Sequence, residues 1–279
     1  MPQSKEPPAS IALPAQRLTL EGAFTLDPAT VEVAVETPVN IVYGSLPYAV
    51  MMASPVDLAD FVTGFSLTEG VIAEASDIRA IEIRAEDGGM VVEVELLPER
   101  FRSHLALARR RNLTGRTSCG LCGIETMADL PFAEQRVRPQ PPVRAEAIAR
   151  ALGDLGQHQA LHRLTRSVHA AVWCDTDGQI ITVREDVGRH NALDKLIGAR
   201  LRMGGGREGF VLVTSRASFE MVEKAAIFGA PALVAISAPT SLAIDRANCL
   251  GLTLVAAARD GGAVVFAGQV AVGQKETAP

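Results

Sequence analysis

The sequence predicts an α/β protein with a smaller N-terminal α+β domain. In the second half, apolar segments of strand length alternate with amphipathic helical segments, the pattern of β-α-β units whose helices cover both faces of a parallel sheet. The first half pairs strand-like segments around short turns and contains one strong helical segment. A proline-rich stretch, RVRPQPPVR, separates the halves. We therefore expect a disordered tail over 1–15, an α+β domain over 16–138 and an α/β domain over 143–279.

Turns and alternation define the elements of the first domain. Segments 31–44 and 46–54 are expected to be strands around a turn at Gly44-Ser45. Ser54-Pro55 combines a capping residue with a first-turn proline, which predicts a helix over 55–71. Alternating apolar residues on both sides of Asp87-Gly88-Gly89 predict a hairpin over 78–97. Further on, the glycines of segment 115–123 predict a mobile loop at the end of this domain.

The second domain is predicted to begin with a helix over 143–156. Two strands joined at Asp177-Gly178 follow, and then helices and buried strands alternate. The remaining expected strands are 167–174, 179–186, 209–215, 231–239 and 252–260, and the remaining helices are 191–205, 216–230 and 240–251.

Composition excludes several classes of protein. The net charge of −5 and the 4% aromatic content argue against a nucleic-acid-binding protein. There is no apolar run long enough to span a membrane, and the first residues do not resemble a signal peptide. Four cysteines are too few for a secreted disulfide scaffold, so we expect a cytoplasmic protein. Cys174 and Cys249 lie in apolar stretches and are expected to be buried.

The other two cysteines, Cys119 and Cys122, form a C-x-x-C pair between glycines. A structural zinc site needs four ligands, and neither the other two cysteines nor the five histidines supply the second close pair that zinc-ribbon spacing demands. A dithiol redox site would normally follow a strand, which is missing here. In sulfur carriage, a thiolate favoured by the nearby Arg116 would attack a donor persulfide and take its outer sulfur. The spacing of the two cysteines alone does not decide between a zinc site, a dithiol redox site and sulfur carriage.

Ligands of open α/β sheets bind beyond the carboxyl ends of the strands. Two predicted strands end in Thr214-Ser215-Arg216 and Ser237–Ser241, directly before helix N-termini that favour anions. Ser215 and Arg216 are therefore candidate phosphate-binding residues, although hydroxyl residues also serve as simple helix caps.

The segment EDVGRHNALDK places four polar residues before a helix: Asp186, Arg189, His190 and Asn191. They could simply cap the helix. We favour a corner that faces a bound cofactor, with Arg189 binding phosphate and His190 donating a proton or a hydrogen bond.

Several stretches together resemble the FdhD family of formate dehydrogenase accessory sulfurtransferases. The similar segments run in family order over nearly the whole chain and are YAVMMASPVDL, GFSLTEGVI, GRTSCGLCGIE, REDVGRHNALDKL, VTSRASFEMVEKAA, SAPTSLAID and GLTLVAAARDG. The resemblance implies a persulfide-carrying sulfurtransferase. It would take sulfur from a cysteine desulfurase and pass it to molybdenum bis(molybdopterin guanine dinucleotide), before this cofactor is inserted into formate dehydrogenase.

The resemblance also assigns residues. Cys119 would carry the persulfide and Cys122 would be auxiliary. The cofactor-binding segment would be Ala257, Ala258, Arg259, Asp260, Gly261 and Gly262. Family members often have an aromatic residue and a basic residue where this chain has Ala257 and Gly262, but Arg259 retains one cation.

The resemblance implies a cytidine-deaminase-like three-layer fold for the main domain and a homodimer. Deaminase chemistry is not expected, because His169-Ala170-Ala171 lacks the catalytic glutamate of zinc deaminases, and we expect no tightly held metal. Two other functions stay open: a cofactor-binding chaperone that does not move sulfur, and a dithiol oxidoreductase.

Overall fold

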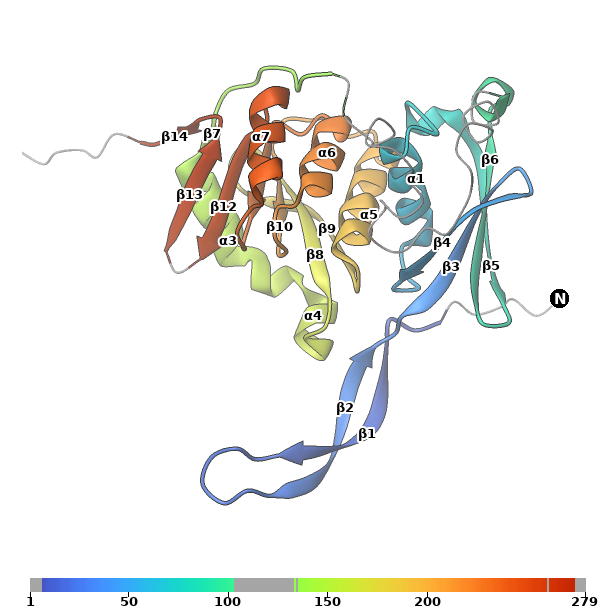
Figure 1. Cartoon of the computed structure of the whole chain (residues 1–279), viewed down its shortest axis with the longest axis vertical. Coiled ribbons are helices and arrows are strands. Elements are labelled where there is room, and N and C mark those ends of the chain that lie inside the picture. The colour runs from blue at the N-terminus through green and yellow to red at the C-terminus, as the bar shows by residue number, and fades with distance from the viewer. Residues whose placement is uncertain (1–6, 103–132, 134, 260, 274–279) are drawn as a thin grey trace, which may run out of the picture.

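The structure is a computed structural model that describes residues 7–102, 133, 135–259 and 261–273. Its centre is a six-stranded sheet in the order β13-β12-β11-β10-β8-β9 (Figure 1). The bounds of these strands are β8 His169–Cys174, β9 Ile180–Asp186, β10 Phe210–Val213, β11 Ala232–Ala235, β12 Thr253–Arg259 and β13 Gly262–Ala267.

This sheet is mixed. Strands β10, β11 and β12 are parallel, whereas β8 is antiparallel to β9 and β10, and β13 is antiparallel to β12. The expected parallel β-α-β units are confirmed for β10, β11 and β12. The turn predicted at Asp177-Gly178 joins β8 to β9, and strand β13, which was not predicted, follows β12 directly. Tight turns of this kind can link only antiparallel strands, so both edges of the sheet are antiparallel.

Helices cover both faces of the sheet, which confirms the α/β class and the three layers. Helix α3 packs on one face through Ala147, Ile148, Ala151 and Leu155. On the other face α5, α6 and α7 lie next to one another in a row (Figure 1). The bounds of the helices are α3 Ala145–His158, α4 Ala160–Thr165, α5 Arg189–Arg202, α6 Phe219–Phe228 and α7 Ser241–Leu250.

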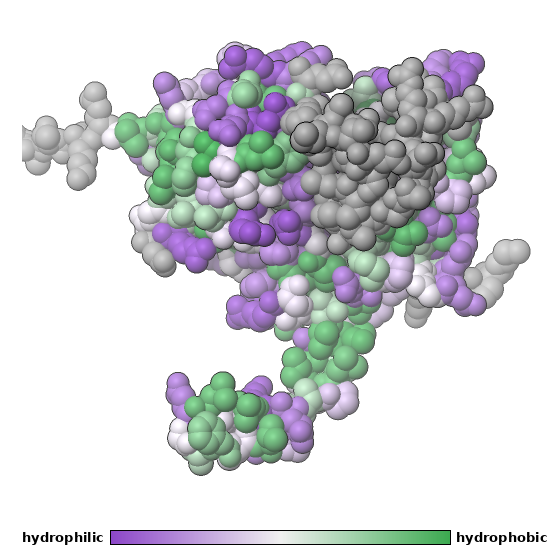
Figure 2. All heavy atoms as spheres, viewed as in Figure 1, coloured by the Kyte–Doolittle hydropathy of each residue, from purple (hydrophilic) through white to green (hydrophobic). Residues whose placement is uncertain are grey.

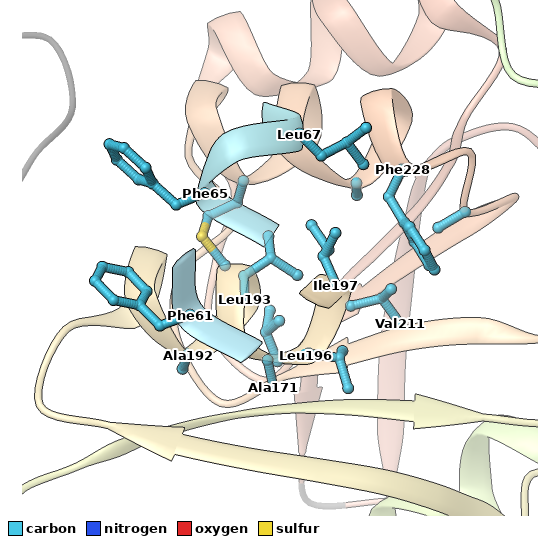
Figure 3. Close-up of a cluster of buried hydrophobic side chains, with 14 of the residues drawn as sticks. Phe61, Phe65, Leu67, Ala171, Ala192, Leu193, Leu196, Ile197, Val211 and Phe228 are labelled. Carbon is cyan, nitrogen blue, oxygen red and sulfur yellow. The ribbon is translucent and has the colours of Figure 1, made fainter. Parts of the chain in front are cut away.

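The first half of the chain builds a second sheet, in the order β4-β3-β6-β5, and helix α1. Helix α1 joins the row of helices beside α5, so its Phe61 and Phe65 share one core with Leu193 and Ile197 of α5 (Figure 3). The bounds are β3 Thr37–Tyr43, β4 Leu46–Ala53, α1 Leu58–Thr68, the 3-10 helix Ala75–Asp77, β5 Ile78–Glu86 and β6 Gly89–Leu96. The predicted β5–β6 hairpin is confirmed.

Strands β1 (Ser10–Leu18) and β2 (Leu26–Ala34) form an antiparallel ribbon, hereafter the arm, which projects from the body (Figure 1). The predicted disordered tail is therefore wrong for residues 10–15. Similarly, the single strand expected over 31–44 is divided between β2 and β3, since the chain leaves the arm at Val35-Glu36.

The predicted helix start at Ser54-Pro55 is wrong by a few residues. Helix α1 begins at Leu58 after Asp57, whose φ of 55° is left-handed. Ser54 is fully buried and serves a different purpose, described below. Two short strands, β7 (Val143–Arg144) and β14 (Val270–Ala271), pair near the C-terminus. Within the described residues, no helix is both long and apolar enough to cross a membrane.

Candidate functional site

The candidate site lies at one edge of the six-stranded sheet, hereafter the carboxyl edge. Because β9 runs in the same direction as β10, β11 and β12, the carboxyl ends of all four strands meet there. Helices α5, α6 and α7 begin at the same edge. Their N-termini present free N–H groups and the positive ends of their dipoles, so this edge favours anions.

Two predicted residues open helix α5. His190 is only 7% exposed, and its Nε2 lies 3.4 Å from Oε2 of Glu220. Arg189 has a buried Nε that finds no hydrogen-bond partner among the described residues. Buried polar atoms are normally satisfied, so the Nε of Arg189 at this helix N-terminus is available to an anionic ligand.

The pair at α6 was not predicted from the sequence. Glu220 lies in the first turn of α6 and accepts a hydrogen bond of 2.8 Å from the hydroxyl of Ser218. Burial acts to raise the pKa of Glu220, but His190 and the Ser218 hydroxyl outweigh it and lower the pKa from 4.5 to about 2. Glu220 is therefore an anion that lies beside His190. The sequence did contain one sign of this residue, because Glu220 is an acidic residue in the first turn of a predicted helix, where the helix dipole stabilises a negative charge.

Another histidine, His169, begins β8 opposite Asp186. Burial and then the charge of Arg189 lower its pKa from 6.5, so the ring is neutral at pH 7. A neutral imidazole can donate or accept a hydrogen bond without adding a buried charge.

The residues predicted after β10 reach the same edge. Ser215 is buried, at 4% exposed, and its hydroxyl donates to the carbonyl oxygen of Arg216 at 3.0 Å. Arg216 is exposed directly before α6. Their small and cationic side chains suit a phosphate that approaches the backbone at the start of this helix.

The segment after β12 has an unusual backbone. Ala257 has a φ of 51°, in the left-handed region, and its N–H donates to the carbonyl of Ser237 at 3.1 Å. The β12–β13 register shifts between Ala256 and Arg259, and this irregularity sets the path of the chain. Strained backbone of this kind costs about 1–3 kcal/mol and clusters at functional sites.

The residues that follow Ala257 differ in their exposure to solvent. Ala258 is buried, whereas Arg259 is exposed and its Nε donates to the carbonyl of Ile236 at 3.4 Å. Gly261 and Gly262 are exposed, and Asp260 lies outside the described residues.

Asp186 and Asn191 are buried and bind neighbouring segments of the chain. Asp186 is fully buried: its Oδ2 accepts from the N–H of Ser54 at 2.9 Å and lies 2.6 Å from Nζ of Lys195. Its Oδ1 accepts from the N–H of Gly188 at 2.8 Å and from Asn191 Nδ2 at 3.0 Å. For these two residues the predicted cofactor-facing corner is wrong. They join the end of β4 to the start of α5 and thereby hold Arg189 and His190 in place.

The cysteines divide into two groups. Cys119 and Cys122 lie outside the described residues. Cys174 is buried, and burial followed by the charge of Asp175 raises the pKa of its thiol to about 12, which makes it inert. Cys249 is exposed near the end of α7, so the prediction that it is buried is wrong.

A cavity of about 770 Å³ lies away from this edge, between the end of α1, segment 135–140 and the end of α6. It contains none of the predicted site residues. Two of its arginines lie against helix C-termini: a Cβ at Gly229 would be 2.9 Å from Arg207 and one at Gly251 would be 3.3 Å from Arg136. These guanidinium groups therefore complement helix carbonyls, and the cavity is a weaker candidate than the carboxyl edge.

Comparison with known proteins identifies one family. The model of the FdhD/NarQ family matches residues 34–272. The chain is 45% identical over 238 residues to the sulfur carrier protein FdhD of Bordetella petrii, with 84% of each chain covered. It is 47% identical over 235 residues to the protein of that name from Xanthomonas euvesicatoria pv. vesicatoria, which covers 84% of this chain and 83% of that one.

A solved structure shares the fold. The chain is similar to a protein from Desulfotalea psychrophila described as a formate dehydrogenase accessory protein, with a TM-score of 0.70 and 26% identity. The similarity covers 93% of this chain and 97% of that chain.

Proposed function

This chain belongs to the FdhD/NarQ family, and we propose that it is a sulfurtransferase that serves formate dehydrogenase in the cytoplasm. In this proposal a cysteine desulfurase supplies persulfide sulfur. The acceptor is the molybdenum cofactor in its bis(molybdopterin guanine dinucleotide) form, which receives the sulfur before insertion into formate dehydrogenase. The cofactor is thus a bound substrate.

Cys119 is the sulfur carrier in this proposal. Its thiolate attacks the outer sulfur of the donor persulfide, the S–S bond of the donor breaks, and the donor leaves as a thiolate. Cys119 then bears the persulfide. In an auxiliary role, Cys122 attacks the inner sulfur of that persulfide, forms a disulfide with Cys119 and releases the outer sulfur as hydrosulfide toward the acceptor.

The single observation that carries the substrate assignment is the unpartnered, buried Nε of Arg189 at the N-terminus of α5. The proposed substrate carries two guanine nucleotide arms with pyrophosphates, and arginine binds such groups in a bidentate manner. Arg216 and Arg259 add cations along the same edge, and Ser215 leaves room for close approach. The exposed Arg259, Gly261 and Gly262, at the end of β12 and the start of β13, complete the proposed binding edge together with Ala257.

The experiment separates sulfur carriage from substrate binding with two variants. After incubation with a cysteine desulfurase and cysteine, intact-mass analysis should show a gain of about 32 Da that maps to Cys119. Cys119→Ser should lose this gain and the activation of formate dehydrogenase, but it should still bind a guanine nucleotide. Arg189→Gln should gain the sulfur, but its affinity for the nucleotide should fall by about tenfold or more.

The alternatives predict other outcomes. A chaperone that binds the cofactor without moving sulfur would tolerate Cys119→Ser. A dithiol oxidoreductase would need Cys119 and Cys122 equally for disulfide turnover. If an active desulfurase adds no sulfur to the wild-type protein, the proposal is wrong.

A further inference from the structure

A second cationic surface lies at the ends of helices α6 and α7 that are far from the carboxyl edge. It is the rim of the cavity of about 770 Å³, a volume within the range of about 300–1,000 Å³ that is usual for specific ligand sites. Segment 135–142 passes over these helix ends (Figure 1), and the N–H of Val137 donates to the carbonyl oxygen of Leu250 at 2.9 Å. Figure 2 shows hydrophilic residues along the top of the molecule, where this segment passes above α7.

Three exposed arginines, Arg136, Arg138 and Arg207, form this rim. None of them forms an ion pair with another residue that the structure describes. Helix C-termini offset part of their charge. Arg207 and Arg136 approach the ends of α6 and α7, and each helix end carries about half a negative charge, so roughly two of the three positive charges remain for a ligand.

The rest of the lining indicates the kind of ligand. The base of the cavity is apolar, and its largest members are Leu67, Ile72, Val137 and Ile227. The described lining contains no acidic side chain for a hard metal cation and no aromatic ring on which a nucleobase could stack. Arginines above an apolar base fit a peptide segment that combines carboxylate and apolar side chains.

The cavity also lies where the cysteine-bearing part of the chain rejoins the described residues. Ala133 lines the cavity, and its N–H donates to Oε2 of the buried Glu223 on α6 at 2.5 Å. Cys122 is eleven residues earlier in the sequence. From Arg100 to Ile124 the sequence has six arginines and no acidic residue, although the whole chain has a net charge of −5. This part of the chain and the rim therefore both favour an acidic partner.

We propose that the cavity is the docking site for an acidic, partly apolar segment of the protein that donates sulfur to Cys119. This inference rests on the proposed function and identifies the surface and the chemistry by which the donor is recognised. Docking leaves the exchange itself unchanged: the Cys119 thiolate attacks the outer sulfur of the donor persulfide, and the donor leaves as a thiolate. Charge complementarity of this kind raises the rate of association, and salt lowers that rate.

The test compares two sulfur donors. One is a cysteine desulfurase supplied with cysteine, and the other is cysteine persulfide, a small molecule that needs no docking surface. For Arg138→Glu/Arg207→Glu, we expect the rate of sulfur gain from the desulfurase to fall about tenfold or more, whereas the rate from cysteine persulfide should equal that of the wild type. The wild-type rate with the desulfurase should fall as NaCl is added, and the rate of this variant should depend less on NaCl. Intact-mass analysis follows both reactions.

Two further variants serve as controls. Arg138→Lys/Arg207→Lys keeps both charges and should retain most of the wild-type rate with the desulfurase. Arg79→Glu/Arg150→Glu makes the same change in net charge at exposed positions on β5 and α3, and it should take up sulfur as the wild type does. Circular dichroism and urea unfolding establish that each variant is folded.

The proposal is overturned if Arg138→Glu/Arg207→Glu takes sulfur from the desulfurase at the wild-type rate. It is also overturned if this variant is equally slow with both donors, because the cavity would then act on Cys119 itself or hold a small molecule. Either result leaves the proposed function standing. A wild-type protein that takes sulfur from neither donor would instead contradict the proposed function, and this inference with it.

Discussion

Glu220 is the clearest case at the carboxyl edge of a side chain whose protonation state is determined by its neighbours. Its side chain is 15% exposed and faces His190, while Ser218 donates to it. Because these contacts favour the ionised form, the folded state holds the pKa near 2, below the ordinary value of 4.5. The folded state consequently binds fewer protons than the unfolded chain between these two values.

The first prediction concerns Glu220→Gln. The ionised carboxylate contributes stability that is fully present above about pH 4.5 and is lost as the pH falls toward about 2. At about 1.4 kcal/mol per pKa unit, this contribution is at most roughly 3 kcal/mol. At pH 7 the variant should therefore unfold with a free energy about 1–3 kcal/mol lower than the wild type.

Urea unfolding from pH 7 down to pH 3.5 checks this prediction. The gap between the variant and the wild type should narrow below about pH 5. Glu82→Gln, exposed on β5, is the control and should follow the wild type at every pH. A gap of constant size down to pH 3.5 would contradict the role assigned to the Glu220 charge.

The site residues show what a sequence can reveal at this scale. Arg189, His190, Ser215 and Arg216 were predicted from their positions at strand ends and helix starts, and the structure places them at one edge. The roles of Asp186 and Asn191 were missed because their partners are distant in the chain. Ser54, which donates to Asp186, is 132 residues away, and no local pattern reports such a contact.

At the scale of elements, the crossing of α1 and α5 depends on two glycines. A Cβ on Gly64 would lie 1.8 Å from the carbonyl oxygen of Asp194, and a Cβ on Gly198 would lie 1.8 Å from that of Asp60. Each glycine therefore lets the backbone of the other helix approach. The close approach allows the side chains of both helices to share the core shown in Figure 3.

The second prediction is that Gly198→Ala is strongly destabilising. The new methyl group meets backbone atoms, which cannot rotate away, so the two helices must separate. We expect a loss of more than about 3 kcal/mol in the free energy of unfolding, the range of severe overpacking. Chemical denaturation followed by circular dichroism measures this loss.

A glycine in another helix provides the control. Gly153 lies within α3, and a Cβ there would have no neighbour within 4 Å. Gly153→Ala should stabilise the protein by about 0.5–1 kcal/mol, because alanine loses less backbone entropy in a helix. If both substitutions had the same effect, the close crossing would not be important for stability.

The elements themselves were predictable to different degrees. The helices of the second half were predicted near their observed positions, because an amphipathic pattern over three turns is a strong local signal. Strands β1 and β13 were missed. Strand β1 (SIALPAQRL) is an exposed ribbon strand that contains a proline and polar residues, so its strand pattern is weak, whereas β13 (GAVVFA) is a short apolar run directly after β12. The antiparallel direction of β8 and β9 agrees with the turn predicted at Asp177-Gly178, whereas the direction of β13 was not predicted because the strand itself was missed.

At the scale of the whole molecule, the two predicted domains share one hydrophobic cluster. That cluster contains Tyr43 and Phe61 from the first half together with Trp173 and Leu196 from the second. Buried polar contacts also join the two halves, since Lys195 of α5 donates a hydrogen bond to the carbonyl oxygen of Ser54 at 2.9 Å. The domain boundary placed between residues 138 and 143 rests on the proline-rich composition of this segment and stays a prediction. The hydrophobic core is shared by the residues before and after it.

The third prediction therefore concerns the two halves of the chain. A fragment of residues 136–279 would expose the faces of α5 and the sheet that α1 and the second sheet cover. It would also leave the buried Lys195 and Asp186 without Ser54. We expect it to lack a cooperative unfolding transition and to bind a hydrophobic dye. Expression together with residues 1–102 should restore the transition, because the contacts between the halves do not require a continuous chain. A fragment 136–279 that unfolds cooperatively by itself would show instead that the α/β half is an independent domain, as the proline-rich segment indicates.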